Sequence, residues 1–190
     1  ASTAIVQKPS VERLVNDFAG VLSERQVAAL EDSLVRYTLR TSTQVTVVTV
    51  RDLEGYDVSS YAYEIGEKWG VGQSGKNNGV VILVKPKFSA NERGRAFIAP
   101  GYGLEGALPD VVCTHIVNDE MIPYFLQNNY ANGIIAGAIA VMKACEGEYY
   151  ASSSNEEDDF FRTIISVLLI IAIFIVLSRM VKGDNHKGGG

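Results

Sequence analysis

The 190-residue sequence is poor in the side chains that carry most nucleophilic and transition-metal chemistry, with two cysteines and two histidines. His115 is the only histidine before residue 186, so no Ser-His-Asp arrangement can be read from the sequence. Neither histidine stands at a ligand spacing from both cysteines, which argues against a zinc site. Lys and Arg number 17 against 22 Asp and Glu, so no basic stripe for nucleic acid is present, and no nucleic-acid partner is expected.

The two cysteines, Cys113 and Cys145, leave two interpretations open. They lie 32 residues apart, and outside the cytoplasm such a pair can form a disulfide. Isolated cysteines also fit small buried positions in a core.

A long run without charge is present near the C-terminus. "TIISVLLIIAIFIVLS", residues 163–178, is extended by apolar flanks to residues 160–181, close to the ~20 residues that cross a bilayer. It is apolar on all sides, whereas a core helix normally keeps a polar face. We therefore predict a transmembrane helix over 160–181, preceded by an acidic linker at 151–159 and followed by a Gly-rich tail at 182–190.

The charges around this run predict its orientation. Acidic residues precede it, and Arg179, Lys182 and Lys187 follow it, so the C-terminus is expected in the cytoplasm. The N-terminal domain then lies in the periplasm or otherwise outside the cytoplasm, held at the cell (inner) membrane by a single span. Such a domain needs an export signal, and residues 1–11 have no apolar core, so we expect a signal peptide to have been removed ahead of them.

Residues 12–150 are predicted to form one α/β domain. Helices are expected from Ser23 to about residue 40, over 57–69, over 109–122 with Pro123 ending the helix, and over 131–148; strands are expected over 44–50, 79–86 and 95–100. A right-handed crossover makes the first two strands parallel, and a hairpin returns the third strand antiparallel. The prediction is a mixed sheet with helices on both faces.

This topology brings two glycine-rich stretches to the same sheet edge. "GVGQSGKNNG", residues 70–79, precedes the second strand, and "PGYGLEGALPD", residues 100–110, follows the third. The first lacks the Walker spacing and precedes a strand, which excludes a phosphate-binding loop of that type. The second contains a G-x-G-x-x-G string, but its strand is an antiparallel return, so a dinucleotide site is not expected.

The polar residues of these stretches favour oxygen chemistry. Carboxylates and amide oxygens suit a hard cation such as calcium or magnesium. The alternative is structural: the glycines allow corners with positive φ, Asp110 complements a helix N-terminus, and Glu105 is solvated. The residues alone leave both interpretations open.

Five ordered stretches carry a resemblance to a known family. They are "VNDFAGVLS" at 15–23, "WGVG" at 69–72, "NNGVVILV" at 77–84, "GYGLEGALPD" at 101–110 and "YANGIIAGAIAVM" at 130–142. In this order and spacing they resemble the TPM domain over about residues 12–150. The resemblance implies a three-layer α/β/α sandwich, and a signal peptide, one membrane helix and a Gly-rich tail are similar to those of many bacterial members.

The resemblance also implies candidate site residues and two functions. Asp17, Glu105 and Asp110 become candidate ligands for calcium or magnesium, with Asn78 and Tyr102 as neighbours. Relatives include lumenal acid phosphatases, cation-binding bacterial proteins and an accessory subunit of a channel. We expect a membrane-tethered accessory module that binds a divalent cation and a membrane protein or envelope complex, for its assembly or maintenance. The alternative is a weak metal-dependent acid phosphatase in which Asp110 positions a metal-bound water.

Overall fold

The computed structural model describes residues 5–147, which belong to one compact unit. Within them no helix has the length and apolar character needed to span a bilayer. The predicted linker, membrane helix and Gly-rich tail lie outside the described residues.

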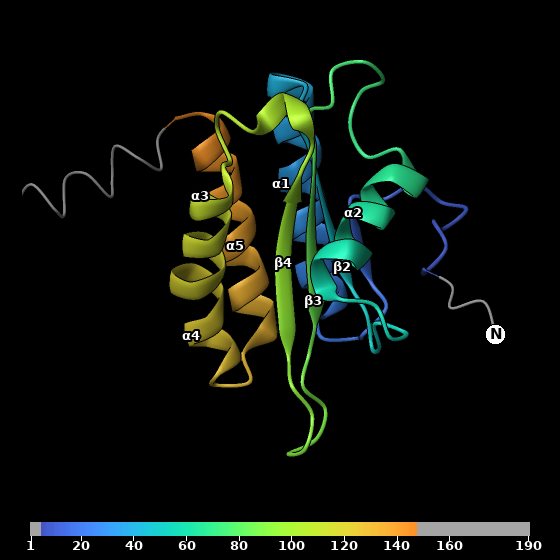
Figure 1. Ribbon diagram of the computed structural model, residues 1–190, viewed down its shortest axis with the longest axis vertical. Helices are drawn as coiled ribbons and strands as arrows, with labels where there is room; N and C mark the ends of the chain where they lie inside the picture. The colour runs from blue at the N-terminus through green and yellow to red at the C-terminus, as the bar shows by residue number, and fades with distance from the viewer. Residues whose placement is uncertain (1–4, 148–190) are drawn as a thin grey trace, which may run out of the picture. The chain divides into compact units, whose positions relative to one another are not determined.

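A four-stranded mixed sheet forms the centre of the domain (Figure 1). In spatial order its strands are β1 (Val15–Asp17), β2 (Gln44–Thr49), β3 (Gly79–Lys85) and β4 (Arg95–Pro100). β1, β2 and β3 are parallel, and β4 is antiparallel to β3. The predicted α/β class and small mixed sheet are therefore confirmed, with β1 as an edge strand that the sequence pattern did not predict.

Helices cover both faces of this sheet. α2 (Val58–Trp69) packs its buried side on one face, where Ile65 belongs to the same apolar cluster as Val81 and Leu83 of β3. α1 (Glu24–Thr41) and α5 (Tyr130–Cys145) contact β2 on the other face, as Figure 1 shows. Because both faces are covered, β2 and β3 are buried almost continuously along their length, although successive side chains point to opposite faces.

The predicted start of α1 is confirmed in atomic detail. Ser23 accepts a hydrogen bond from the Gln26 N–H, and the Gln26 side chain accepts one from the Ser23 N–H. This reciprocal capping box satisfies two backbone donors that a helix start otherwise leaves unpaired.

The segment after β4 is more irregular than predicted. α3 (Asp110–His115) continues into the π-helical η2 (Ile116–Met121) and then α4 (Ile122–Phe125). The prediction that Pro123 ends this helix is wrong. The Ile122 N–H donates to the Val117 carbonyl five residues back, so the turn is widened before the proline. Pro123 then lies in the first turn of α4, where a missing N–H is tolerated.

Two glycines of α5 allow this segment to approach closely. A Cβ on Gly133 would overlap the Phe125 ring, and one on Gly137 would overlap the Met121 side chain. α5 is therefore a core helix, as its apolar composition predicted, and its glycines serve helix packing.

The N-terminal segment belongs to the fold from Ile5 onward. Ile5 is buried in the apolar cluster under α2, and the Val6 N–H donates to the Tyr61 hydroxyl at 3.1 Å. Trp69 Nε1 donates to the Val6 carbonyl at 3.0 Å. These contacts join Ile5 and Val6 to the core of the domain under α2.

The two mid-helix glycines Gly133 and Gly66 predict opposite responses to the same substitution. Gly133→Ala is expected to destabilise the domain by about 1–3 kcal/mol, because its methyl group meets Phe125 and the Met121 carbonyl in a closed interface. Gly66→Ala is the matched control. Its methyl group would make ordinary contact with Val81, so the helix preference of alanine should stabilise by up to about 1 kcal/mol. Urea denaturation of both variants gives the two signs, and a stable Gly133→Ala domain would contradict this packing.

Candidate functional site

The two glycine-rich stretches meet at the amino edge of the parallel strands, as the topology predicted. The Gly101 N–H donates to the Gly79 carbonyl at 2.8 Å, and the Gly103 N–H donates to the Asn77 carbonyl at 3.0 Å. These bonds connect the loop before β3 to η1 (Tyr102–Leu104), the short 3₁₀ turn after β4. The loop after β4 is therefore fixed by main-chain contacts.

Glycine is required at these positions because two backbones lie in contact. A Cβ on Gly101 would overlap the Asn77 carbonyl oxygen, and a Cβ on Gly103 would overlap that of Lys76. Gly106, three residues further, has open space around it. The G-x-G-x-x-G string thus reflects loop packing at its first two glycines.

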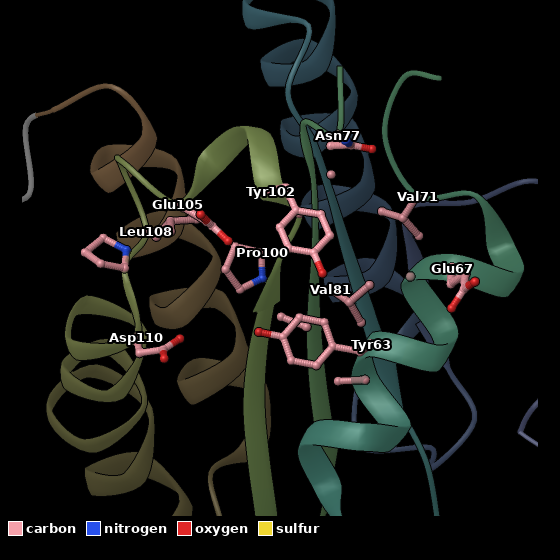
Figure 2. Close-up of a pocket in the computed structure, with 16 residues that line it drawn as sticks. Tyr63, Glu67, Val71, Asn77, Val81, Pro100, Tyr102, Glu105, Leu108 and Asp110 are labelled. Carbon is pink, nitrogen blue, oxygen red and sulfur yellow. The ribbon is translucent and has the colours of Figure 1, made fainter. Parts of the chain in front are cut away.

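A cavity of about 870 Å³ opens between α2 and this loop (Figure 2). Val81 and Ala99 of the sheet contribute apolar lining, and Tyr63 and Gly66 of α2 form one wall. The other wall comes from η1 and the start of α3. Its lining residues there include Tyr102, Glu105, Leu108, Pro109 and Asp110.

Two tyrosines give the cavity an aromatic character. Figure 2 shows the Tyr102 hydroxyl pointing towards Tyr63. The Tyr102 side chain is 81% exposed and Tyr63 is 47% exposed, so both rings are available to a ligand. The Tyr63 ring packs edge-to-face against the Phe97 ring, with their centroids 5.8 Å apart.

The cavity is also acidic. Glu105 and Asp110 lie on the wall formed by η1 and α3, whereas Glu67 on α2 points away from them (Figure 2). Among the described residues that line the cavity, none is Lys, Arg or His. None of the ion pairs within residues 5–147 involves these three carboxylates.

The negative charge of the cavity affects the hydroxyl of Tyr63. Burial raises the pKa of its hydroxyl, and the charge of Asp110 raises it further, with smaller effects from nearby groups that include Glu105. The structure therefore brings Tyr63 and the two carboxylates into electrostatic contact, although Tyr63 belongs to a different element.

The predicted neighbour Asn78 has a structural role. Its side-chain oxygen accepts from the Gln73 N–H at 2.8 Å, and its amide donates to the Ser42 carbonyl at 2.6 Å. The adjacent Asn77 lines the cavity instead. Sequence reasoning also missed Tyr63 and Glu67; Tyr63 lies off the apolar stripe of its helix, and an aromatic residue there was the available signal.

Asp17 lies at the opposite edge of the sheet, where β1 ends beside Thr49. Its carboxylate accepts from the Leu22 N–H at 2.8 Å and from the Thr49 hydroxyl at 2.5 Å, with longer bonds from Gly20 and Val21. The structure thus brings together Glu105 and Asp110 but not Asp17. A cation at Asp17 would occupy a separate site.

The described residues contain no group of three or more His, Cys, Asp or Glu side chains placed to hold a metal ion. Both cysteines are free thiols. Burial raises the pKa of Cys113 to about 12 and that of Cys145 to about 11, so they remain protonated at neutral pH. The structure shows the unbridged alternative of the two interpretations.

The fold and its cleft define a small α/β domain with a mixed sheet, helices on both faces and an acidic, tyrosine-lined cavity at one sheet edge. The model of the TPM domain family matches residues 15–144, most of the described residues. The chain belongs to the TPM domain family, which confirms the resemblance seen in the sequence.

Solved structures agree with this assignment. The N-terminal domain of a protein from P. gingivalis is 33% identical with a TM-score of 0.63, and the match covers 73% of this chain and 85% of that one. The N-terminal domain of a Corynebacterium glutamicum protein is 16% identical, with a TM-score of 0.54 and coverage of 76% and 89%. The BA42 protein of the psychrophilic Bizionia argentinensis is 19% identical, with a TM-score of 0.54 and coverage of 67% and 83%. The last two show the fold alone, and no curated protein matches this chain.

Gly103→Ala is expected to loosen the wall of the cavity. Its methyl group cannot fit against the Lys76 carbonyl, so the hydrogen bond from residue 103 to Asn77 should be lost, with destabilisation of about 1–3 kcal/mol. Gly106→Ala is the matched control in the same loop, and it should change stability by less than about 0.5 kcal/mol. Thermal denaturation with amide hydrogen exchange at residues 101–104 measures both. Equal effects of the two substitutions would contradict the close-contact explanation.

Asp17→Ala is expected to destabilise the domain by about 1–3 kcal/mol, because three backbone N–H groups and the Thr49 hydroxyl lose their acceptor. Asp32→Ala provides the comparison. It removes an exposed carboxylate paired only with Arg36 and should cost less than about 1 kcal/mol. Chemical denaturation at pH 7 distinguishes the two variants. An unchanged free energy of unfolding in Asp17→Ala would contradict the structural role assigned to this carboxylate.

Proposed function

We propose that this protein is a membrane-tethered, extracytoplasmic accessory module whose cleft binds a divalent cation and a protein partner. The observation that carries the proposal is the cavity between α2 and the loop after β4. It holds Glu105 and Asp110 without a basic residue among its described lining, and its tyrosine rings are exposed. Such a surface attracts positively charged groups and leaves contact area for a partner.

The donors of the cavity fit a hard cation of low affinity. Its polar lining offers oxygen ligands, namely the two carboxylates with the Asn77 amide and the Tyr102 hydroxyl, and calcium and magnesium prefer oxygen. With two carboxylates on this wall and no group of three within the described residues, a bound ion would keep several waters. We expect a Kd of about 10⁻⁴–10⁻³ M, which is typical of extracellular calcium modules.

A metal-dependent phosphatase is the alternative, and the cavity favours it less. Phosphate binding uses arginine, lysine or a metal ion to balance its charge, and none of the described lining residues is basic. Phosphate could therefore bind only after a cation had entered. Hydrolysis would then depend on the cation for both binding and catalysis.

One relative supports the accessory role. The solved P. gingivalis relative is an N-terminal domain, which supports a module that works as part of a longer chain. The proposed membrane helix at 160–181 would confine the module to a thin layer at the membrane. Confinement raises its effective concentration for an envelope complex, so weak contacts suffice.

Calcium and magnesium titration of residues 1–147, followed by amide NMR shifts, tests the cation site. This unit is compact in itself, and the related P. gingivalis domain was solved separately. Saturable shifts at residues 63, 77, 101–108 and 110 are expected, with loss of at least about tenfold in affinity in Glu105→Gln/Asp110→Asn because the carboxylate ligands are removed.

The matched control is Glu24→Gln/Asp32→Asn, which removes two charges from α1 on the other face of the sheet. It should bind as the wild type does. Absence of shifts at 10 mM cation, or an equal loss of cation affinity in both double variants, would contradict the cation site. Hydrolysis of p-nitrophenyl phosphate that Asp110→Asn abolishes would instead favour the phosphatase.

A further inference from the structure

The cavity is shaped for a flat cationic group. We propose that the partner inserts an arginine side chain between Tyr63 and Tyr102, with its guanidinium against Glu105 and Asp110. This inference rests on the proposed function, because it identifies which chemistry of a protein partner the same cleft accepts.

The first argument is the pairing of rings and charges. Tyr63 comes from α2 and Tyr102 from η1, so the aromatic groups contribute from both sides of the cavity, and Figure 2 shows the Tyr102 hydroxyl directed towards Tyr63. A cation over the face of a tyrosine is attracted by the ring quadrupole. The two carboxylates line the adjoining wall of η1 and α3, and carboxylate oxygens accept the N–H groups of a guanidinium.

The second argument is charge complementarity. Glu105 and Asp110 have no ion-pair partner within residues 5–147, and the described lining of the cavity contains no basic side chain. A partner that brings a positive charge therefore neutralises carboxylates that the domain leaves unbalanced. A partner segment with acidic side chains would be repelled.

The third argument selects arginine over lysine. Guanidinium is planar, stacks on aromatic rings and donates two parallel hydrogen bonds to a carboxylate, whereas an ammonium group is a compact and strongly hydrated point charge. The partly exposed apolar lining from Val71 and Pro109 suits the methylene groups of the arginine stem. The volume of about 870 Å³ leaves room for the flanking residues of an extended segment.

Divalent cations and arginine would use the same carboxylates. Binding of one therefore weakens binding of the other, and the effect is reciprocal. The cleft of the proposed module would therefore hold either the cation or the partner's arginine at one time, and millimolar calcium is expected to lower its affinity for the partner segment.

The test is NMR titration of residues 1–147 with the blocked peptide acetyl-Val-Arg-Val-amide. Saturable shifts at residues 63, 67, 102 and 105–110 are expected. The citrulline peptide, which has nearly the same shape without the charge, should bind at least about tenfold more weakly, and the lysine peptide should be weaker by a smaller factor. Addition of 10 mM calcium should raise the apparent Kd of the arginine peptide.

Two variants locate the peptide. Tyr102→Ala removes a ring that is 81% exposed and should weaken the arginine peptide by about tenfold without unfolding the domain. Tyr124→Ala, at a tyrosine that is 40% exposed on α4 and outside the cavity lining, is the matched control and should leave binding unchanged.

The outcomes separate this inference from the proposed function. Calcium shifts without arginine-peptide shifts would overturn the inference and leave the cation site standing. Shifts with the peptide but not with calcium would support the inference and contradict the cation site of the proposed function. Equal binding of the citrulline or lysine peptide would overturn the role of guanidinium, and equal effects of Tyr102→Ala and Tyr124→Ala would place the peptide elsewhere.

Discussion

The contact between the loop before β3 and the turn after β4 is the constraint on which the site depends. Gly101 and Gly103 donate backbone hydrogen bonds across it, and neither position has room for a side chain. This contact fixes where η1 begins, and η1 in turn orients Tyr102, Glu105 and the start of α3 towards α2. Without it the loop would be free to move, and the carboxylates would have no defined relation to Tyr63.

The sheet and its covering helices could be predicted because their signals are local. The β-branched run at 44–50 and the apolar run at 79–86 match β2 and β3 within one residue. The three-residue β1 is too short to show a period, and it is a strand only because β2 lies beside it. The anchoring of Val6 by Tyr61 and Trp69 joins residues more than 50 positions apart, which no sequence window contains.

The site could be predicted only in part, because topology is readable from local signals and side-chain packing is not. Topology alone places the loops at 70–79 and 100–110 on one sheet edge, and the structure confirms that they meet. Asp17 became a candidate cation ligand only through the family resemblance. Because β1 was not predicted, the sequence did not show at which edge of the sheet Asp17 lies. The position of Tyr63 off the apolar stripe of α2 indicates exposure, but the sequence of the helix does not show that the loop at 100–110 lies beside it.

The charge of the cavity separates the two functions by the sign of their calcium dependence. A phosphate ester carries negative charge, so an acidic cavity admits it only when a cation has first neutralised Glu105 and Asp110, and activity must then rise with calcium. A basic partner segment needs the same carboxylates free of a bound cation, so its affinity must fall as the calcium concentration rises. One ion therefore acts as an essential cofactor for the enzyme and as a competitor for the docking module. Because both responses arise from the same two side chains, the dependence on calcium distinguishes the functions even before a natural partner or substrate is known.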